Sequence, residues 1–346
     1  QPLAQWNVAN VTNMKGMFSD TRAFNQPIGQ WNVANVTDMQ LMFNAARAFN
    51  QSIGQWNVAN VTNMREMFFG ARAFNQAIGQ WNVSQVTTMR NMFWGAAAFN
   101  QPIGQWNVSQ VTDMHSMFDG AAAFNQPIGQ WNVSQVRTMS YMFSGAAAFN
   151  QPIGQWNVSQ VTDMSRMFSG AAAYNQAIGQ WDVSQVTNMN SMFNNATSFN
   201  QPLGQWNVSQ VTAMDSMFNG ATAFNQDVSN WIVKSSPDMT FMFNGSGYTY
   251  QEPNVENSIK RYNEKKQLML VSNRAEKEDP NHPDSMPTKQ GEVLSIDGLR
   301  RTTNAFLGGN RRRKTQKRKY KTINNKSKKK RKQSKKKVKK QRKIKR

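Results

Sequence analysis

The side chains with the clearest chemistry are the Lys and Arg residues at the end of the chain. Residues 311–346 contain 23 Lys or Arg and no acid, whereas the whole chain carries +22, so residues 1–310 together carry 22 − 23 = −1. Dense positive charge binds polyanions by releasing condensed counterions, with a strong salt dependence and no sequence readout. The candidate polyanion-binding residues are Arg311, Arg312, Arg313, Lys314, Lys317, Arg318, Lys319, Lys328, Lys329, Lys330, Arg331, Lys332, Lys335, Lys336 and Lys337.

Three kinds of polyanion partner satisfy this chemistry. Nucleic acid, an anionic membrane surface and a nuclear-import receptor would each be bound by such a segment. Tyr320 is its only aromatic residue, so base stacking would add little and sequence-specific RNA recognition is not expected. The remaining alternative is a solubilising extension without a partner.

Enzymatic chemistry is not expected from this sequence. The chain has no Cys, which removes thiolate catalysis, disulfides and Cys-ligated metals, and its only His residues are His115 and His282. Neither His belongs to a converging set of acid, base and nucleophile, and the repeated glycines lack the spacing of a phosphate-binding loop. We therefore predict no catalytic, cofactor-binding or metal-binding residues.

The rest of the chain is built from a repeated unit. Residues 1–250 hold ten 25-residue copies without an insertion, and the Trp of each copy recurs at 6, 31, 56, 81, 106, 131, 156, 181, 206 and 231. A fixed period of this length is typical of a solenoid, in which each unit buries its apolar side chains against its neighbours. We expect a monomeric solenoid.

Two periods within the unit predict an α/β solenoid. Met114, Met117, Phe118 and Ala121 have helical spacing after Thr112 as N-cap, and Gly120 falls where the helix would stop. Trp106 and Val108 alternate as in a short strand. Stacked units would form a parallel sheet on one face and short helices on the other. The predicted structural core comprises Trp106, Val108, Val111, Met114, Met117, Phe118 and Phe124.

Two surfaces of the unit are candidates for ligand contacts. The position after the first Met of each helix varies freely from copy to copy, for example Arg90, His115 and Ser140. The sheet face instead carries uniform amides, in columns that include Gln105 and Asn107 and are expected to form stacked ladders. A solvated helix surface and a structural ladder are the plainer interpretations of these two patterns.

The spacing Ile103-x-x-Trp106-x-Val108-x-x-Val111 is similar to that of leucine-rich repeats, with Trp and Val in place of Leu. More closely, WNVSQVTDM followed by MFSGAAAFNQ resembles the repeat of the BspA-like leucine-rich-repeat surface proteins, also described as mycoplasma-type lipoprotein repeats. The resemblance covers residues 1–250. It implies a curved right-handed solenoid without catalysis, and attachment to host or matrix proteins in the best-known members. The resemblance assigns no ligand-binding residues to this sequence.

The ends of the chain differ from the repeats. We predict a degenerate capping repeat over 226–250, a capping helix over 251–272, a linker over 273–310 and a disordered polybasic tail over 311–346. The chain opens with Gln1 in the middle of a unit, which suggests a fragment and leaves a signal peptide undecided. The sequence contains no run of 18 or more apolar residues, so it predicts no transmembrane segment.

Two functional hypotheses follow. The first is a non-enzymatic surface or attachment protein whose solenoid binds other proteins or glycans, placed at the cell surface or secreted by the family resemblance. The second is an intracellular or virion-associated protein that binds nucleic acid or another polyanion through its tail, for which the basic segment indicates the nucleus or a virion. A salt titration against DNA with and without residues 311–346 separates them.

Overall fold

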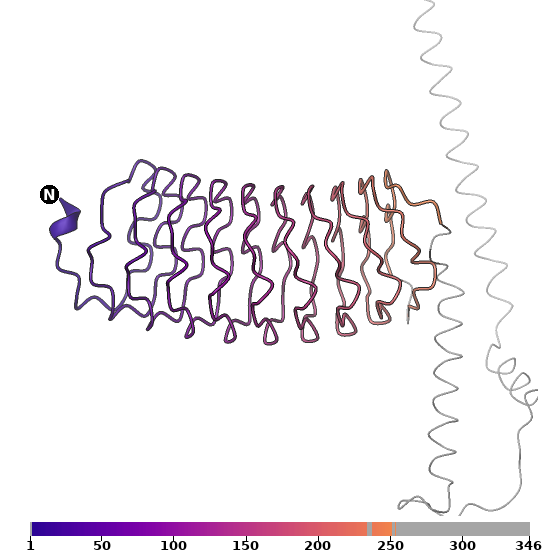
Figure 1. Cartoon of the computed structure of the whole chain (residues 1–346), viewed down its shortest axis with the longest axis horizontal. Coiled ribbons are helices and arrows are strands. Elements are labelled where there is room, and N and C mark those ends of the chain that lie inside the picture. Colours follow the sequence, from indigo (N-terminus) through magenta and orange to yellow (C-terminus); the bar gives the residue numbers. More distant parts are fainter. Residues whose placement is uncertain (1, 234–236, 251–252, 254–346) are drawn as a thin grey trace, which may run out of the picture. The chain divides into compact units, whose positions relative to one another are not determined.

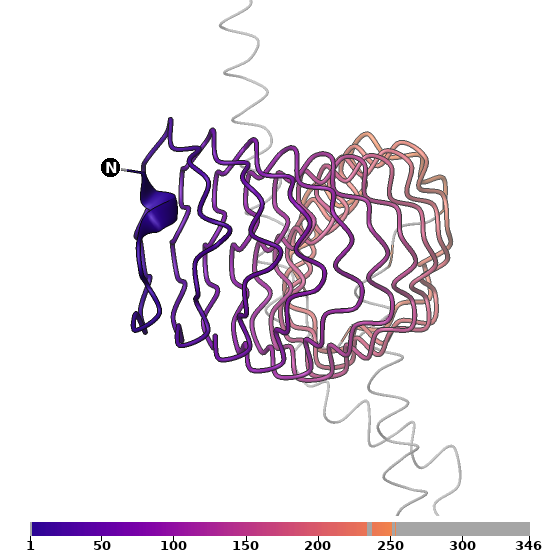
Figure 2. The same cartoon turned by 60° about the vertical axis from the view of Figure 1, so that its left-hand side comes forward.

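The computed structural model describes residues 2–233, 237–250 and 253. Within them the chain forms successive coils that stack side by side (Figure 1), and each coil repeats the path of the one before it (Figure 2). We number the 25-residue blocks from 1–25 to 226–250 as coils 1 to 10. The predictions for residues 254–346, which include the linker, the tail and most of the capping helix, lie outside the described residues.

The core is a continuous interior shared by all coils. In coil 5 the seven predicted core residues are all buried, with Trp106 exposed to only 3% and the others to 1% or less. Equivalent rings stack from coil to coil: Phe93 and Phe118 lie 5.6 Å apart between centroids, and Trp81 and Trp106 lie 6.5 Å apart. Each coil therefore completes the interior of its neighbours, as expected of a solenoid.

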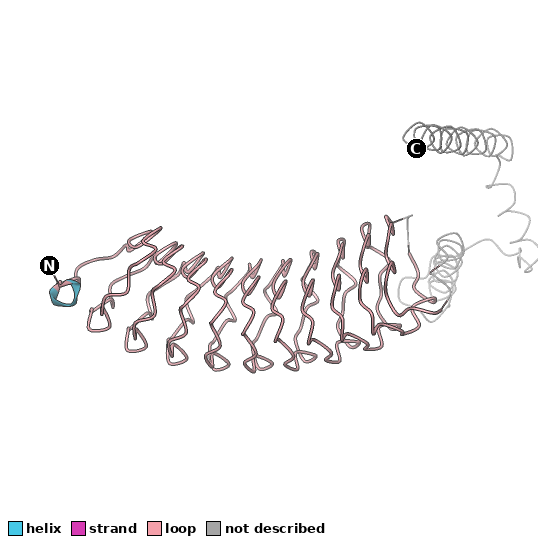
Figure 3. Cartoon of the chain, turned by 90° about the horizontal axis from the view of Figure 1, so that it is seen from above, coloured by secondary structure: helices cyan, strands magenta, loops and turns pink. Residues whose placement is uncertain are grey.

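The predicted helix after Thr112 is wrong. The one regular element in the described part of the chain is the 3₁₀ helix η1 (Leu3–Gln5), and Figure 3 shows the coils as loops and turns. Ser116 has a φ of +52°, and the equivalent residue of every coil is left-handed, whereas a helix needs right-handed residues throughout. The backbone N–H groups of 114, 116, 118 and 120 instead donate to carbonyls of the next coil.

The predicted strand around Trp106 is also wrong. Parallel pairing between coils lies at Asp113, which bridges Thr88 on one side and Thr138 on the other. Trp106 and Val111 donate their N–H groups to residues three positions back, so the segment between them lies between two turns and is too short for a strand. The alternation of Trp106 and Val108 marked two buried side chains correctly, but a tight coil rather than a sheet places them inside.

The stacked amides lie in different columns from those predicted. Asn107 accepts the N–H of Ser109 within its own coil at 3.2 Å, and Gln105 makes no side-chain hydrogen bond to a described residue. The ladder runs instead through Asn100: its Oδ1 accepts the N–H of Asn125 at 2.9 Å and the amide of Gln126 at 3.0 Å. This arrangement repeats along the stack and fastens each coil to the one before it.

Tryptophan and threonine add further links between coils. The indole N–H of Trp106 donates to the carbonyl of Ile78 in coil 4 at 3.1 Å, which pairs a buried polar atom. The hydroxyl of Thr112 donates to the carbonyl of Thr87 at 3.4 Å, so it links coils and does not cap a helix. Side chains and backbone thus hold neighbouring coils in one register.

Candidate functional site

A groove crosses several coils on the outer surface of the stack. It has a volume of about 730 Å³ and spans coils 3 to 8. We call it the Gln/Pro groove. It is lined by Gly54, Gln55, Ala77, Gly79, Gln80, Pro102, Gly104, Gln105, Pro127, Gly129, Gln130, Pro152, Gly154, Gln155, Gln176 and Ala177.

The glycine row explains why the surface is hollow there. A Cβ built on Gly104 would lie 2.4 Å from the backbone oxygen of Pro127 in coil 6, well inside van der Waals contact. Gly79 and Gly129 meet the next coil in the same way. Glycine is therefore required for the coils to approach each other, and the missing side chains leave a bare strip of backbone.

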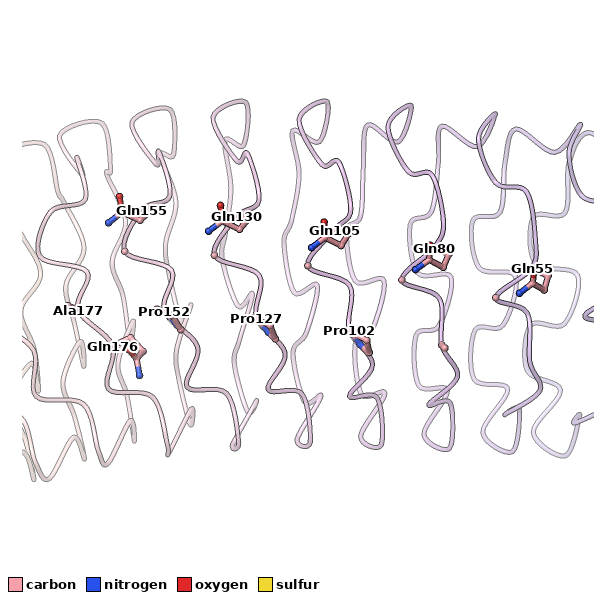
Figure 4. A pocket seen from close by; sticks show the side chains of 16 residues that line it. Gln55, Gln80, Pro102, Gln105, Pro127, Gln130, Pro152, Gln155, Gln176 and Ala177 are labelled. Atoms are coloured by element: carbon pink, nitrogen blue, oxygen red, sulfur yellow. The ribbon is translucent and has the colours of Figure 1, made fainter.

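Two rows of side chains border this strip. Figure 4 shows Gln55, Gln80, Gln105, Gln130 and Gln155 in one row, with Pro102, Pro127 and Pro152 in a second row beside it. The five Gln residues are exposed and make no side-chain hydrogen bond to a described residue. The groove therefore presents one free primary amide per coil, which can both donate and accept hydrogen bonds.

A second surface varies from coil to coil and includes the position after the first Met. We define the variable edge as the positions of His115, Ser116 and Asp119 in every coil. On it Phe69 and Trp94 stack with centroids 4.2 Å apart, Trp94 is 39% exposed, and its indole N–H donates to Asp119 at 3.1 Å. Burial raises the pKa of Asp119, although hydrogen bonds to Ser144, Trp94 and Ser116 oppose the shift.

The variable edge also contains a Ser–His pair. Nδ1 of His115 lies 2.6 Å from Oγ of Ser140, the distance expected between a nucleophile and its base. Ser140 is only 3% exposed, however, and Asp113 accepts the backbone N–H of His115 and not its ring N–H. A substrate could not reach this hydroxyl in the observed arrangement. We interpret the contact as a link between coils.

Three arginines form a separate row in the first coils. Arg22, Arg47 and Arg72 are exposed, follow a left-handed corner in each coil, and make no ion pair with a described residue. The same position holds Ala in coils 4 to 7. The two ion pairs in the described part of the chain, Arg65 with Glu66 and Arg90 with Asp113, lie on the variable edge and beside it.

All of the predicted polyanion-binding residues, from Arg311 to Lys337, lie outside the described residues. Among residues 2–233, 237–250 and 253, no group of three His, Asp or Glu side chains is arranged to hold a metal ion. No helix in this part of the chain is long and apolar enough to cross a membrane. Sequence reasoning missed the groove, although the Gly-Gln pair that precedes the repeat Trp in coils 2 to 9 was its visible signal.

The stacked coils and shared interior define a repeat protein of the solenoid class. The chain belongs to the family described as Mycoplasma protein of unknown function, DUF285, whose pattern matches residues 1–101, 71–176 and 151–257. A search of curated proteins found no match. The family assignment agrees with the repeats, and its description names no ligand.

Proposed function

We propose that this chain is a non-enzymatic interaction scaffold of the BspA-like leucine-rich-repeat type, a surface or attachment protein whose solenoid binds proteins or glycans. One observation carries the proposal: the interior and the links between coils repeat almost unchanged, while the outer surface offers an extended groove and an edge that varies. A rigid scaffold with a variable surface is suited to binding, because little conformational entropy is lost when a ligand docks.

The residues that line the Gln/Pro groove support a binding role. The groove is lined only by Gly, Gln, Pro and Ala, and in the Ser–His contact of the variable edge the Ser140 hydroxyl belongs to a buried residue. None of the groups that line the groove is a general acid, base or nucleophile at neutral pH. Neutral amides and bare backbone are suited to recognition.

The test is a binding screen of the full-length protein against soluble glycans and extracellular-matrix proteins. A solenoid ligand should remain bound when the fifteen candidate tail residues are replaced by Gln, and should be weakened by substitutions in the Gln/Pro groove or at Trp94. The tail variant is the control for non-specific charge. If every interaction disappears with the tail charges and none responds to the solenoid variants, the proposal fails.

The sequence supports a second candidate function. The 23 positive charges of residues 311–346 favour binding of nucleic acid or another polyanion, with the solenoid as a spacer or adaptor. Under this alternative the full-length protein should bind DNA tightly at low salt and lose affinity steeply as salt is added. The fifteen-residue Gln variant should bind much more weakly. Unchanged DNA affinity in that variant would contradict the tail hypothesis.

A further inference from the structure

The Gln/Pro groove offers unpaired amide groups and no charge. All 16 lining residues are uncharged, so a charged ligand would be partly desolvated there without gaining an ion pair. In coil 5 the backbone N–H and C=O groups of Gly104 and Gln105 make no hydrogen bond to a described residue, and neither does the side chain of Gln105. The groove therefore suits a neutral ligand that itself carries N–H and C=O groups.

The step between coils at the groove matches an extended peptide. Each Gln of the row precedes a Trp, and the ring centroids lie 6.4 to 6.5 Å apart along the series Trp56, Trp81, Trp106, Trp131 and Trp156. A β-strand rises about 3.2–3.4 Å per residue, so it presents the same edge again after roughly 6.4–6.8 Å. Every second residue of such a peptide can therefore make the same contact in successive coils.

Other peptide conformations do not keep this register. An α-helix repeats after about 5.4 Å and uses its backbone N–H and C=O groups internally, so it has none to offer to the groove. A polyproline II helix completes a turn in three residues of about 3.1 Å, or roughly 9.3 Å, and would miss alternate coils. The measured step therefore selects the extended conformation among these three.

A primary amide is able to pair with the edge of a strand through two hydrogen bonds. Its oxygen accepts the N–H of one peptide residue, and its NH₂ group donates to the carbonyl of the same residue, which points to the same edge. Figure 4 shows the Gln side chains in one row along the stack, where a single strand edge would meet all of them. The glycine strip beside the row leaves room for peptide side chains, and the Pro rings offer them apolar surface.

We propose that the Gln/Pro groove binds an extended, uncharged peptide segment of a partner protein, which runs along the stack with two residues per coil. The side-chain amides of Gln55, Gln80, Gln105, Gln130 and Gln155 hydrogen-bond to the backbone of every second peptide residue. Because these contacts are to backbone groups, the groove selects for extension and neutrality more than for one sequence. This inference rests on the proposed function, since it names the partner class and the surface that the scaffold uses.

The experiment is titration calorimetry of the full-length protein with acetylated and amidated peptides of alternating Thr and Ala, three to thirteen residues long. Affinity should rise with every two residues added and level off near nine residues, because five Gln residues at two peptide residues per coil span about that length. These peptides are uncharged, so the tail does not attract them. Affinity that is independent of length would overturn the assignment of two residues per coil.

A modified ligand tests the backbone contacts directly. Two neighbouring residues of a strand direct their N–H groups to opposite edges. N-methylation of two neighbouring central residues of the nine-residue peptide therefore blocks a donor on whichever edge faces the Gln row. The methylated peptide should bind at least tenfold more weakly than the unmodified one. Equal affinity of the two peptides would show that the backbone is not recognised and would overturn the inference.

Matched protein variants locate the site. Replacing Gln80, Gln105 and Gln130 together by Ala should weaken binding of the nine-residue peptide at least tenfold. The control replaces Gln85, Gln110 and Gln135 by Ala, since these residues are also exposed, lie in the same three coils and do not line the groove. The control should bind as the unchanged protein does. Equal effects of the two sets would overturn the inference, and near-ultraviolet circular dichroism checks that both variants fold.

The outcomes separate this inference from the proposed function. If no peptide of the series binds, or if the groove retains neutral oligosaccharides in place of peptides, the peptide assignment is wrong. If a ligand from the binding screen is nevertheless retained and is lost in Trp94→Ala, the scaffold function still stands. If neither the peptides nor any ligand of the screen binds the solenoid, both proposals fail.

Discussion

At the scale of single residues, Tyr174 departs from a column that is otherwise Phe in coils 1 to 9. It occupies the position of Phe149 in coil 6 and Phe199 in coil 8, and its ring stacks between them at 5.8 and 6.0 Å. Its hydroxyl is buried and has no hydrogen-bond partner among the described residues. Burial raises the pKa of Tyr174 well above its ordinary value. The ring of Tyr174 therefore fits the column, whereas its buried hydroxyl lowers the stability of the fold.

Replacing Tyr174 by Phe should therefore stabilise the protein. Removing a buried, unpaired hydroxyl regains its desolvation penalty, so we expect a gain of about 1 kcal/mol in the free energy of unfolding. Urea denaturation followed by Trp fluorescence measures the change. The reverse substitution, Phe149→Tyr, should lower stability by a similar amount. A loss of stability in Tyr174→Phe would show that the hydroxyl has a partner.

His115 links protonation to stability. Burial lowers its pKa, Arg90 lowers it further, and Asp113 and Asp163 act in the opposite direction. The ring nitrogen against Ser140 and the ring of Tyr141 at 5.6 Å complete its surroundings. Because the folded-state pKa lies below the unfolded value of about 6.5, the unfolded state binds the proton more readily. The contribution of His115 to the free energy of unfolding is therefore fully present above the unfolded-state pKa, and it falls as the pH drops from there towards the folded-state pKa.

The His115→Gln variant tests this linkage, since Gln cannot take up the proton. We expect the variant to gain stability relative to the unchanged protein when the pH is lowered through the region of the His pKa. The comparison is urea unfolding of both proteins on either side of that region, so that the effects of other titrating groups cancel. A difference in unfolding free energy that does not change with pH would rule out His115 as the responsible group.

At the scale of the coil, a tight approach between backbones decides which residues are allowed. Gly104 must lack a side chain because the next coil lies against it, whereas Gly204 would place a Cβ 3.1 Å from the oxygen of Asp227. The same position is Ser229 in coil 10. The glycine row is thus a consequence of stacking and not of turn conformation, since Gly104 is not among the left-handed residues.

Gly104→Ala should destabilise the stack by about 1–3 kcal/mol, because the added methyl group forces the backbone of coil 6 to move. Gly204→Ala is the matched control and should cost less, since its contact is 0.7 Å longer than the 2.4 Å contact of Gly104. Urea midpoints of the two variants provide the comparison. Equal losses would indicate that chain flexibility, and not the contact, sets the cost.

At the scale of the whole stack, coils contact mainly their neighbours, so the length of the solenoid is adjustable in units of one period. The hydrogen bonds of Asn100, Trp106 and Thr112 join residues 25, 26 or 28 positions apart, which is about one period. Stability is then approximately a sum of coil and interface contributions. Figures 1 and 3 show the coils following one another along a single row.

Deleting residues 101–125 should leave a folded stack, because Gln126 then follows Asn100 just as Gln101 does now. We expect the denaturant m-value to fall by about one tenth, in proportion to the surface lost. Deleting residues 101–112 removes half a period and should prevent folding. Far- and near-ultraviolet circular dichroism with urea titration distinguishes these results. Equal damage from the two deletions would contradict the nearest-neighbour description.

The sequence by itself determined the period, the number of coils and the identity of the buried side chains. Trp106, Val108, Met114 and Phe118 could be assigned to the interior because only a shared core explains apolar residues that recur at one fixed interval. It also separated the nearly neutral repeats from the basic last segment. These properties depend on composition and spacing, which are visible without coordinates.

Only the tertiary structure decided the backbone path. The left-handed residue at Ser116, Tyr141 and Arg166 has no sequence signal, because these residue types ordinarily avoid that conformation. Hydrogen bonds to the next coil compensate for its strain, and such bonds exist only once the coils have stacked. The Gln/Pro groove has the same origin: it forms where one backbone meets the next, a contact that no single repeat contains.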